Sequence, residues 1–207
     1  PSLDRLILTF AAFGGLATES MTRGFAWRFL DIGRRIERAI ATLHLLQGTL
    51  VELLPREGPL LEAVLEIADS LMTYRRRYMT TLQAAPVLDL LLADESNPRS
   101  VAFQLVRLAE HVQALPHSAA EAEVGRRTIE ERLLLRRLTD VRLLDMLHEA
   151  QPITAADGET RRSRVEDLLG GMAVDMFTLS ERLSQRYLSH AIATRQLASN
   201  SFTPPPP

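Results

Sequence analysis

From about residue 22 to residue 54, apolar residues recur every three or four positions with no proline to interrupt them. At about 100° per residue, seven of them share one side of a helix: Phe25, Phe29, Ile32, Ile36, Ile40, Leu43 and Leu50. Charged residues, Arg38 among them, gather on the far side, where Asp31 and Arg35 are spaced to form an ion pair. A helix of this length with one apolar side must pack against other elements, so the pattern predicts a helical core built around it.

The same period continues along the rest of the chain between proline and glycine breaks. It predicts helices over residues 2–14, 59–82, 87–93, 98–115, 119–150 and 159–193. Asn97 is expected to cap the helix that Pro98 opens, and Gly170-Gly171 to mark a bend or a close helix crossing. No segment alternates with the period of a strand. The expected fold class is therefore all-α, an up-and-down bundle of about five to seven long amphipathic helices with no sheet.

Length and composition bound the class of protein. With 207 residues, 46% hydrophobic and 24% charged, residues 1–193 are expected to form a single helical domain and the proline-rich residues 194–207 a disordered tail. The net charge of −2 argues against nucleic-acid binding, and no apolar run is long enough to cross a membrane. No signal peptide opens the chain, so a cytoplasmic location is expected. Because the chain starts without methionine inside an amphipathic pattern, we expect it to be a piece of a longer polypeptide.

The available side chains exclude several enzyme classes. All 24 basic residues are arginine, so the chain offers no lysine for a Schiff base or a P-loop. It has no cysteine, and no serine in a Gly-x-Ser-x-Gly elbow. The five histidines are scattered without ligand spacing. We therefore expect no metal site and no cofactor bound by this chain.

Glu37 is the acidic residue that most needs an explanation. It projects along a flank of the apolar stripe together with Gly33 and Ala41, whose small size leaves room for another helix. A carboxylate in that position is half or fully buried and requires a partner. Arg75 points into the edge of the apolar face of residues 60–82. We hypothesise a charge-assisted contact between Glu37 and Arg75, acting either as a structural clamp or as the polar floor of a binding site.

The arginine clusters in the first half of the chain leave two interpretations open. They either lie on solvated faces with ordinary ion pairs, or face an anionic group such as a peptide carboxylate or a phosphate. The second interpretation names Arg34, Arg75, Arg77 and Arg99. Asn97 joins this set because free backbone N–H groups at the start of a helix suit an anion.

Three aromatic residues lie near these arginines in the sequence, namely Trp27, Tyr74 and Tyr78. At helical spacing such residues pack against other helices, with the hydroxyl or indole N–H bonded to a partner. The alternative is an aromatic wall that holds a ligand.

Three segments carry a resemblance to a known family. The segments 33–39 (GRRIERA), 73–78 (TYRRRY) and 94–101 (DESNPRSV) resemble the signatures of the Alpha-E family, which is named for its helical content and its Glu-Arg motif. The resemblance covers roughly residues 5 to 116. It implies a helical domain found beside, or fused behind, a circularly permuted ATP-grasp domain, often with transglutaminase-like proteins encoded nearby. A full member carries an earlier Gly-Arg-x-x-Glu-Arg-Ala copy upstream, which this chain lacks.

Two functions follow from the residues and the resemblance together. The first is a non-catalytic helical partner of an ATP-grasp-type amide or peptide ligase, which binds or presents an anionic or peptide substrate. ATP and Mg²⁺ would then belong to the ATP-grasp partner. The alternative is a catalytic domain acting on amide bonds, with Glu37 as the base and Arg75 and Arg77 as an anion clamp. A homo-oligomer is also considered.

Overall fold

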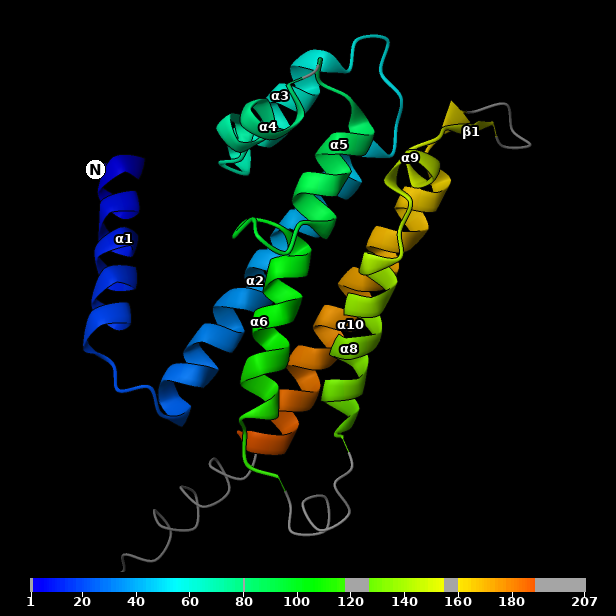
Figure 1. Cartoon of the computed structure of the whole chain (residues 1–207). Helices are drawn as coiled ribbons and strands as arrows, with labels where there is room; N and C mark the ends of the chain where they lie inside the picture. The colour runs from blue at the N-terminus through cyan, green and yellow to red at the C-terminus, as the bar shows by residue number, and fades with distance from the viewer. Residues whose placement is uncertain (1, 80, 118–126, 155–159, 189–207) are drawn as a thin grey trace, which may run out of the picture.

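A computed structural model of the chain describes residues 2–79, 81–117, 127–154 and 160–188. Four helices of this described part form a ring in which each packs against the next (Figure 1): α2 (Phe25–Leu50), α6 (Val101–Gln113), α8 (Ile129–Arg142) and α10 (Ser163–Tyr187). Successive members of the ring run in opposite directions. The expected all-α, up-and-down bundle is therefore confirmed.

The apolar stripe of the central stretch faces the core of this bundle. Its members from Ile32 to Leu50 are buried, and Leu43 and Leu46 are fully inaccessible to solvent. The first member of the predicted stripe is an exception, because Phe25 is 54% exposed at the start of α2. The leucines and methionines of α6, α8 and α10 fill the space opposite.

Gly170 and Gly171 lie where α10 approaches its two neighbours. A side chain at Gly170 would stand 3.7 Å from the amide nitrogen of Gln47 on α2. One at Gly171 would stand 3.6 Å from the guanidinium of Arg137 on α8. Both glycines lie inside the continuous helix α10, and these are ordinary contact distances to the ends of long side chains, so a close helix crossing stays a prediction.

Short helices cover one end of the bundle (Figure 1), and their bounds are α3 (Gly58–Ile67), α4 (Leu71–Tyr78), α5 (Ala84–Leu88), the π-helical turn η1 (Asp89–Ala93) and α9 (Met146–Glu149). The prediction of one helix over residues 59–82 is wrong. The chain turns at Asp69, whose φ is 48°, and the N–H of Ser70 bonds back to the carbonyl of Leu65 at 2.8 Å. This left-handed residue ends α3 in the way a glycine commonly does.

Other element bounds also differ from the expectation. The first helix, α1 (Leu3–Ser20), continues through Gly14-Gly15, and α6 begins after Ser100 rather than at Asn97. Two short strands, β1 (Ile153–Thr154) and β2 (Thr160–Arg161), pair antiparallel, so the expectation of no sheet is wrong at this hairpin. The predicted tail at 194–207 lies outside the described residues.

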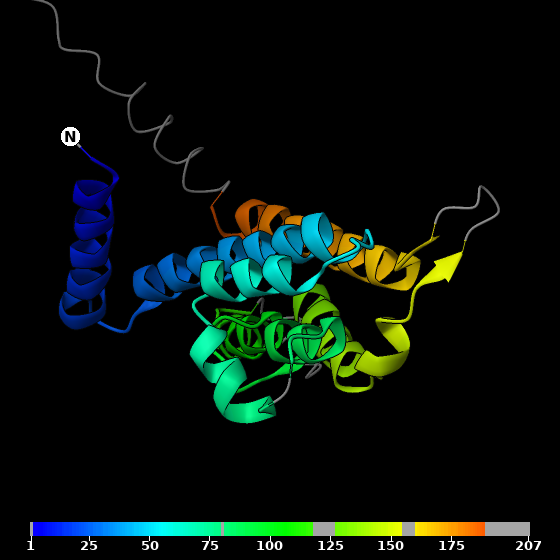
Figure 2. The same ribbon diagram turned by 90° about the horizontal axis from the view of Figure 1, so that it is seen from above.

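Helix α1 stands apart from the bundle in both views (Figures 1 and 2). It joins α2 through residues 21–24, and Ala17 is its only buried residue. Within the described ranges, no helix combines the length and the apolar character that a membrane span requires.

Candidate anion-binding groove on the central helix

A shallow groove follows the outer side of α2 in two parts that share Arg38 and Ala41. The first part has a volume of about 750 Å³ and is lined by Phe29, Leu30, Gly33, Arg34, Glu37, Arg38 and Ala41. The second has a volume of about 500 Å³ and is lined by Arg38, Ala41, Thr42, His44, Leu45, Ile67, Ala68 and Arg99. We call these two parts together the α2 groove. Its residues come mainly from α2 at spacings of three and four, which place them on one flank of the helix.

Arg38 lies at the junction of the two parts and is half-buried. Burial lowers the pKa of its guanidinium, and the positive charges of Arg99, Arg35 and Arg34 lower it further. Within the described chain, neither Arg34 nor Arg38 has a carboxylate within ion-pair distance. Arg99 does have one, since its guanidinium lies 2.8 Å from the exposed carboxylate of Asp69. The groove therefore gathers three arginines against one lining carboxylate, that of Glu37, with Arg99 also paired to Asp69.

Arg35 belongs to a different cluster, between α2 and α6. Its Nε donates to Asp31 at 3.0 Å and its Nη1 to the buried Gln104 at 3.1 Å. His111 Nε2 donates to the same Asp31 carboxylate at 2.7 Å, and Trp27 packs edge-on against the His111 ring. Burial raises the pKa of Asp31, but the bonds from His111 and Arg35 outweigh it, so the pKa is lowered. This cluster holds two bundle helices together and is separate from the groove.

The hypothesis of a Glu37–Arg75 contact is wrong. Glu37 is exposed and lines the α2 groove beside Arg34, and no ion pair of the described residues joins it to Arg75. Arg75 is exposed and donates to Glu62 on α3 at 2.7 Å. The hypothesis assumed one straight helix over residues 59–82, and the turn at Asp69 changes the direction in which α4 presents its side chains.

Arg77 lies away from the groove, at the loop formed by residues 94–99. Its guanidinium donates to the buried carboxylate of Asp94. The other oxygen of Asp94 accepts from the backbone N–H of Ser96 at 2.9 Å and from its hydroxyl at 2.7 Å. The Arg77 guanidinium therefore holds a tightly folded loop.

The two tyrosines of α4 pack at the same end of the molecule, with ring centroids 5.0 Å apart. Tyr74 is buried, and its hydroxyl donates to the carbonyl of Thr81 at 3.3 Å. The Tyr78 hydroxyl donates to Asp89. Burial raises the pKa of Tyr78, and the bond to the Asp89 carboxylate raises it further. Neither tyrosine lines the α2 groove.

Asn97 is buried, with both ends of its amide bonded to protein. Its Nδ2 donates to the carbonyl of Leu90 at 3.0 Å and to the hydroxyl of Ser70 at 3.2 Å. Its Oδ1 accepts from the N–H of Arg99 at 3.1 Å. Thr42 on α2 donates to the carbonyl of Arg99 at 3.3 Å. These bonds fold the loop so that it carries Arg99 to the α2 groove.

Of the six residues expected to bind an anion, the structure brings three to this groove: Arg34, Glu37 and Arg99. It places Arg75, Arg77 and Asn97 elsewhere. Sequence reasoning missed Arg38, which it assigned to the solvated side of the helix. The spacing of four between Arg34 and Arg38 was the available signal, because such residues lie one turn apart on the same flank.

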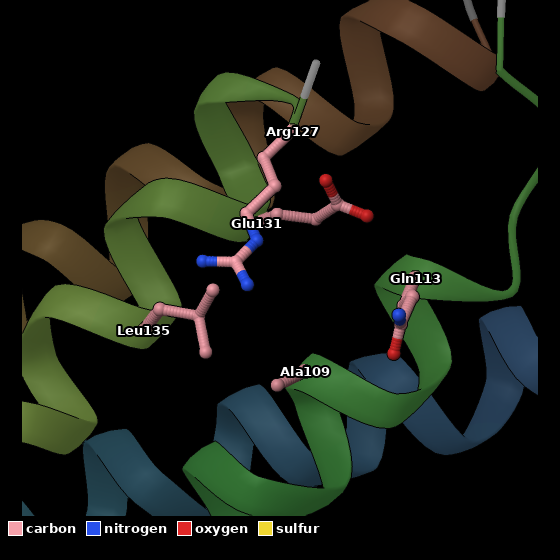
Figure 3. Close-up of a pocket in the computed structure, with 5 residues that line it drawn as sticks. All are labelled: Ala109, Gln113, Arg127, Glu131 and Leu135. Carbon is pink, nitrogen blue, oxygen red and sulfur yellow. The ribbon is translucent and has the colours of Figure 1, made fainter. Parts of the chain in front are cut away.

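A separate small cavity of about 110 Å³ lies between α6 and α8, where Arg127 and Glu131 of the α8 side face Gln113 of α6 (Figure 3). The Glu131 carboxylate already accepts from the N–H of Thr128 at 2.8 Å, and the Thr128 hydroxyl accepts in return from the N–H of Glu131 at 3.1 Å. This capping box commits Glu131 to the start of α8. The cavity is too small for the peptide-sized ligands that the α2 groove could hold.

The fold and the groove define a helical-bundle domain with an arginine-lined flank. The Alpha-E family, described as a predicted alpha-helical domain with a conserved ER motif, matches residues 1–188, and the chain belongs to it. The Glu37-Arg38 dipeptide of the segment that resembles the family signature lies at the centre of the groove.

The chain is also similar to curated mycobacterial proteins. The uncharacterized proteins Rv2567 of Mycobacterium tuberculosis and Mb2597 of Mycobacterium bovis are each 33% identical to it over 177 residues. The match covers 84% of this chain and 19% of each relative, so the chain spans about a fifth of their length. No solved structure matches the chain.

Proposed function

We propose that the chain is a non-catalytic helical domain that binds an anionic group, such as a peptide carboxylate, in the α2 groove. The observation that carries this proposal is the environment of Arg38. Its guanidinium is half-buried and is crowded by the positive charges of Arg99, Arg35 and Arg34, against which Asp31 acts as a smaller attraction. No carboxylate of the described residues lies within ion-pair distance of it. A bound anion would neutralise that excess charge, and the planar guanidinium is suited to carboxylate and phosphate groups.

The walls of the α2 groove favour a peptide over a bare inorganic ion. Phe29 and Leu30 lie at one end, and Leu45 and Ile67 at the other, with the arginines between them. Binding sites for organic ligands commonly combine such apolar walls with a few polar groups that fix orientation. An acidic or C-terminal carboxylate could bind to Arg38 while neighbouring side chains contact the apolar ends.

The ligase partner in this proposal comes from the resemblance to Alpha-E proteins, which occur beside or fused behind circularly permuted ATP-grasp domains. ATP and Mg²⁺ bind to that ATP-grasp domain, and the α2 groove holds the peptide that is to be joined. The relatives are about five times longer than the matched segment, which leaves ample chain for further domains. A transglutaminase-like protein is a second partner of the same system, and the location is cytoplasmic.

The catalytic alternative keeps one supporting observation, namely that Glu37 lies in the same groove as Arg34 and Arg38. Arg75 and Arg77, the clamp first expected for it, lie elsewhere. Under this alternative Glu37→Gln abolishes turnover but preserves binding. Under the binding proposal Glu37→Gln changes ligase activity little, and Arg38→Gln is the damaging substitution.

Calorimetric titration with a short acidic peptide tests the binding proposal. The ligand control is the same peptide with amidated carboxylates. Arg38→Gln is expected to weaken binding at least about tenfold, as loss of a charge-assisted hydrogen bond would. Arg76→Gln is the matched control because Arg76 is exposed on α4, outside the groove, and should bind like the wild type. Equal binding of the amidated peptide, or an unaffected Arg38→Gln variant, would overturn the proposal.

The ligase step needs its own experiment. A pull-down with a permuted ATP-grasp protein, followed by ligase assays with and without this chain, measures whether the two act together. We expect the wild-type chain to stimulate ligase activity and the Arg38→Gln variant to fail to stimulate it. If no complex forms and ligase activity is unchanged, the partner role is contradicted. Anion binding is tested separately, by the calorimetric titration.

A further inference from the structure

Helix α1 meets its own α2 at the short link between them and diverges from it toward the N-terminus (Figures 1 and 2). Near the link the two helices touch, since a side chain at Gly14 would stand 3.6 Å from the guanidinium of Arg34. Arg23 fastens the link to both helices. It donates to the carbonyl of Thr18 on α1, and its guanidinium lies 4.5 Å from the centroid of the Trp27 ring on α2. The two helices are therefore the arms of an open helical hairpin.

One face of α1 repeats with the spacing of a coiled coil. Its members alternate intervals of four and three residues and carry no charge, and we call them the α1 stripe: Leu3, Ile7, Phe10, Gly14 and Ala17. Ala17, nearest to the link, is buried. The other end of the stripe is open, because Leu3 is 72% and Phe10 is 70% exposed. An apolar stripe with this spacing normally packs against a second helix.

The outer flank of α2 follows the same intervals. The residues concerned all line the α2 groove: Leu30, Arg34, Glu37, Ala41 and His44. The observed contact of Gly14 with Arg34 sets the register, because facing residues of an antiparallel hairpin are counted in opposite directions from a known pair. The pairs that follow are Phe10 with Arg38, Ile7 with Ala41 and Leu3 with Leu45. Extending the contact along both arms thus brings the α1 stripe onto the groove.

The flank of α2 has room for this approach. A side chain at Gly33 would meet no other element of the described chain within 4 Å, and Ala41 is exposed. Small residues at such positions let two helices come close together. The first part of the groove, about 750 Å³ in volume, lies on the same flank and would be covered by the closed hairpin.

The charge of the groove determines when the hairpin can close. The α1 stripe brings no carboxylate, since Asp4 and Glu19 lie off it. Closing over an empty groove would remove Arg34 and Arg38 from water without a partner, which is costly. A bound peptide carboxylate would neutralise them, and Phe10 would then contact apolar parts of the peptide. Building on the anion binding proposed above, we propose that α1 is a lid that closes over the α2 groove when an acidic peptide occupies it.

A cross-link within one chain tests the lid, without background because the chain has no cysteine. Ile7→Cys and Ala41→Cys face each other in the closed hairpin, so mild oxidation of dilute protein should join them. The acidic peptide of the titration should speed the link about tenfold, because a ligand shifts the population toward the state that it binds better. The amidated peptide should leave the rate unchanged. The matched control is Leu8→Cys with Ala41→Cys, which should stay unlinked because Leu8 lies off the stripe.

Binding affinity gives a second measurement. Phe10→Ala should weaken binding of the acidic peptide about tenfold, as loss of a large apolar contact does. Leu8→Ala is the control, because Leu8 is also 70% exposed, and it should bind like the wild type. A peptide that binds the Ile7→Cys, Ala41→Cys chain without speeding its cross-link would overturn the lid and leave the anion site standing. A peptide that fails to bind in the titration would overturn both proposals.

Discussion

The guanidinium of Arg162 lies buried where the end of α2, the chain after α9 and the segment before α3 meet. It donates to the carbonyl oxygens of Leu50 at 3.0 Å and Ala150 at 2.9 Å, and to the carboxylate of Glu57 at 2.9 Å. Alanine would leave these acceptors without a partner. We therefore expect Arg162→Ala to lower the free energy of unfolding by about 3 kcal/mol, measured by urea denaturation.

Arg136→Ala is the matched control for this prediction. The Arg136 side chain is 75% exposed, and its nearest carboxylate, that of Asp140, is 3.9 Å away. Exposed pairs of this kind contribute little, so the change should stay within about 0.5 kcal/mol. Similar losses in both variants would show that burial of Arg162 is not what stabilises this junction.

The hypotheses about single residues were the least accurate part of the sequence analysis. The flank position of Glu37 followed from helical period alone, but the expected burial is wrong, because the structure leaves Glu37 exposed on that flank. Its partner could not be deduced, because the direction of Arg75 depends on a backbone turn two residues before α4. Asp69 adopts a left-handed conformation without being glycine, and its residue type is only a weak signal of this, because most aspartates do not adopt it.

At the scale of elements, Ser100 caps α6 in place of the predicted Asn97. The Ser100 hydroxyl accepts from the N–H of Phe103 at 3.0 Å and donates to the carbonyl of Asp94. Asn97 instead holds the preceding loop. Ser100→Ala should therefore cost about 1–2 kcal/mol and lower the melting temperature by a few degrees. Thermal unfolding followed by circular dichroism measures this loss.

Thr139→Ala provides the comparison within a helix. Thr139 is exposed in the last turn of α8, and its hydroxyl bonds only to the carbonyl of Leu135 one turn earlier. Alanine is the better helix former, so this variant should melt within a degree or two of the wild type. A Ser100→Ala variant that melts like Thr139→Ala would contradict the capping role.

Helical period predicted the bundle well because α2 and α10 are long and each turn repeats the same contrast between core and solvent. Short elements carry too few turns for that contrast to appear, which is why α3 and α4 merged into one predicted helix and the hairpin of β1 and β2 went unnoticed. The α2 groove was only partly foreseen. It depends on where the 94–99 loop places Arg99, and that placement is set by a local bond to Asn97 and a tertiary bond to Thr42 on α2.

At the scale of the whole molecule, the contact between α2 and α6 contains a charged cluster in addition to its apolar side chains. Asp31 lies at its centre, with Arg35 on its own helix and His111 and Gln104 on α6. Since the folded pKa of Asp31 is lowered, its ionised form stabilises the fold. That contribution is fully present above the ordinary pKa of an aspartate, about 3.9, and is lost as the pH falls through the lower folded value.

Asp31→Asn removes this dependence while keeping a side chain of the same shape. We expect the variant to be less stable than the wild type at pH 7 by about 1–2 kcal/mol, because the asparagine cannot accept charge-assisted bonds from both Arg35 and His111. Urea unfolding at pH 7, 5 and 3 measures the difference, and the other acids titrate in both proteins and largely cancel. The gap should narrow from pH 5 to pH 3, as wild-type Asp31 begins to take up a proton. A gap that is the same at all three values would show that the charge on Asp31 does not hold α2 against α6.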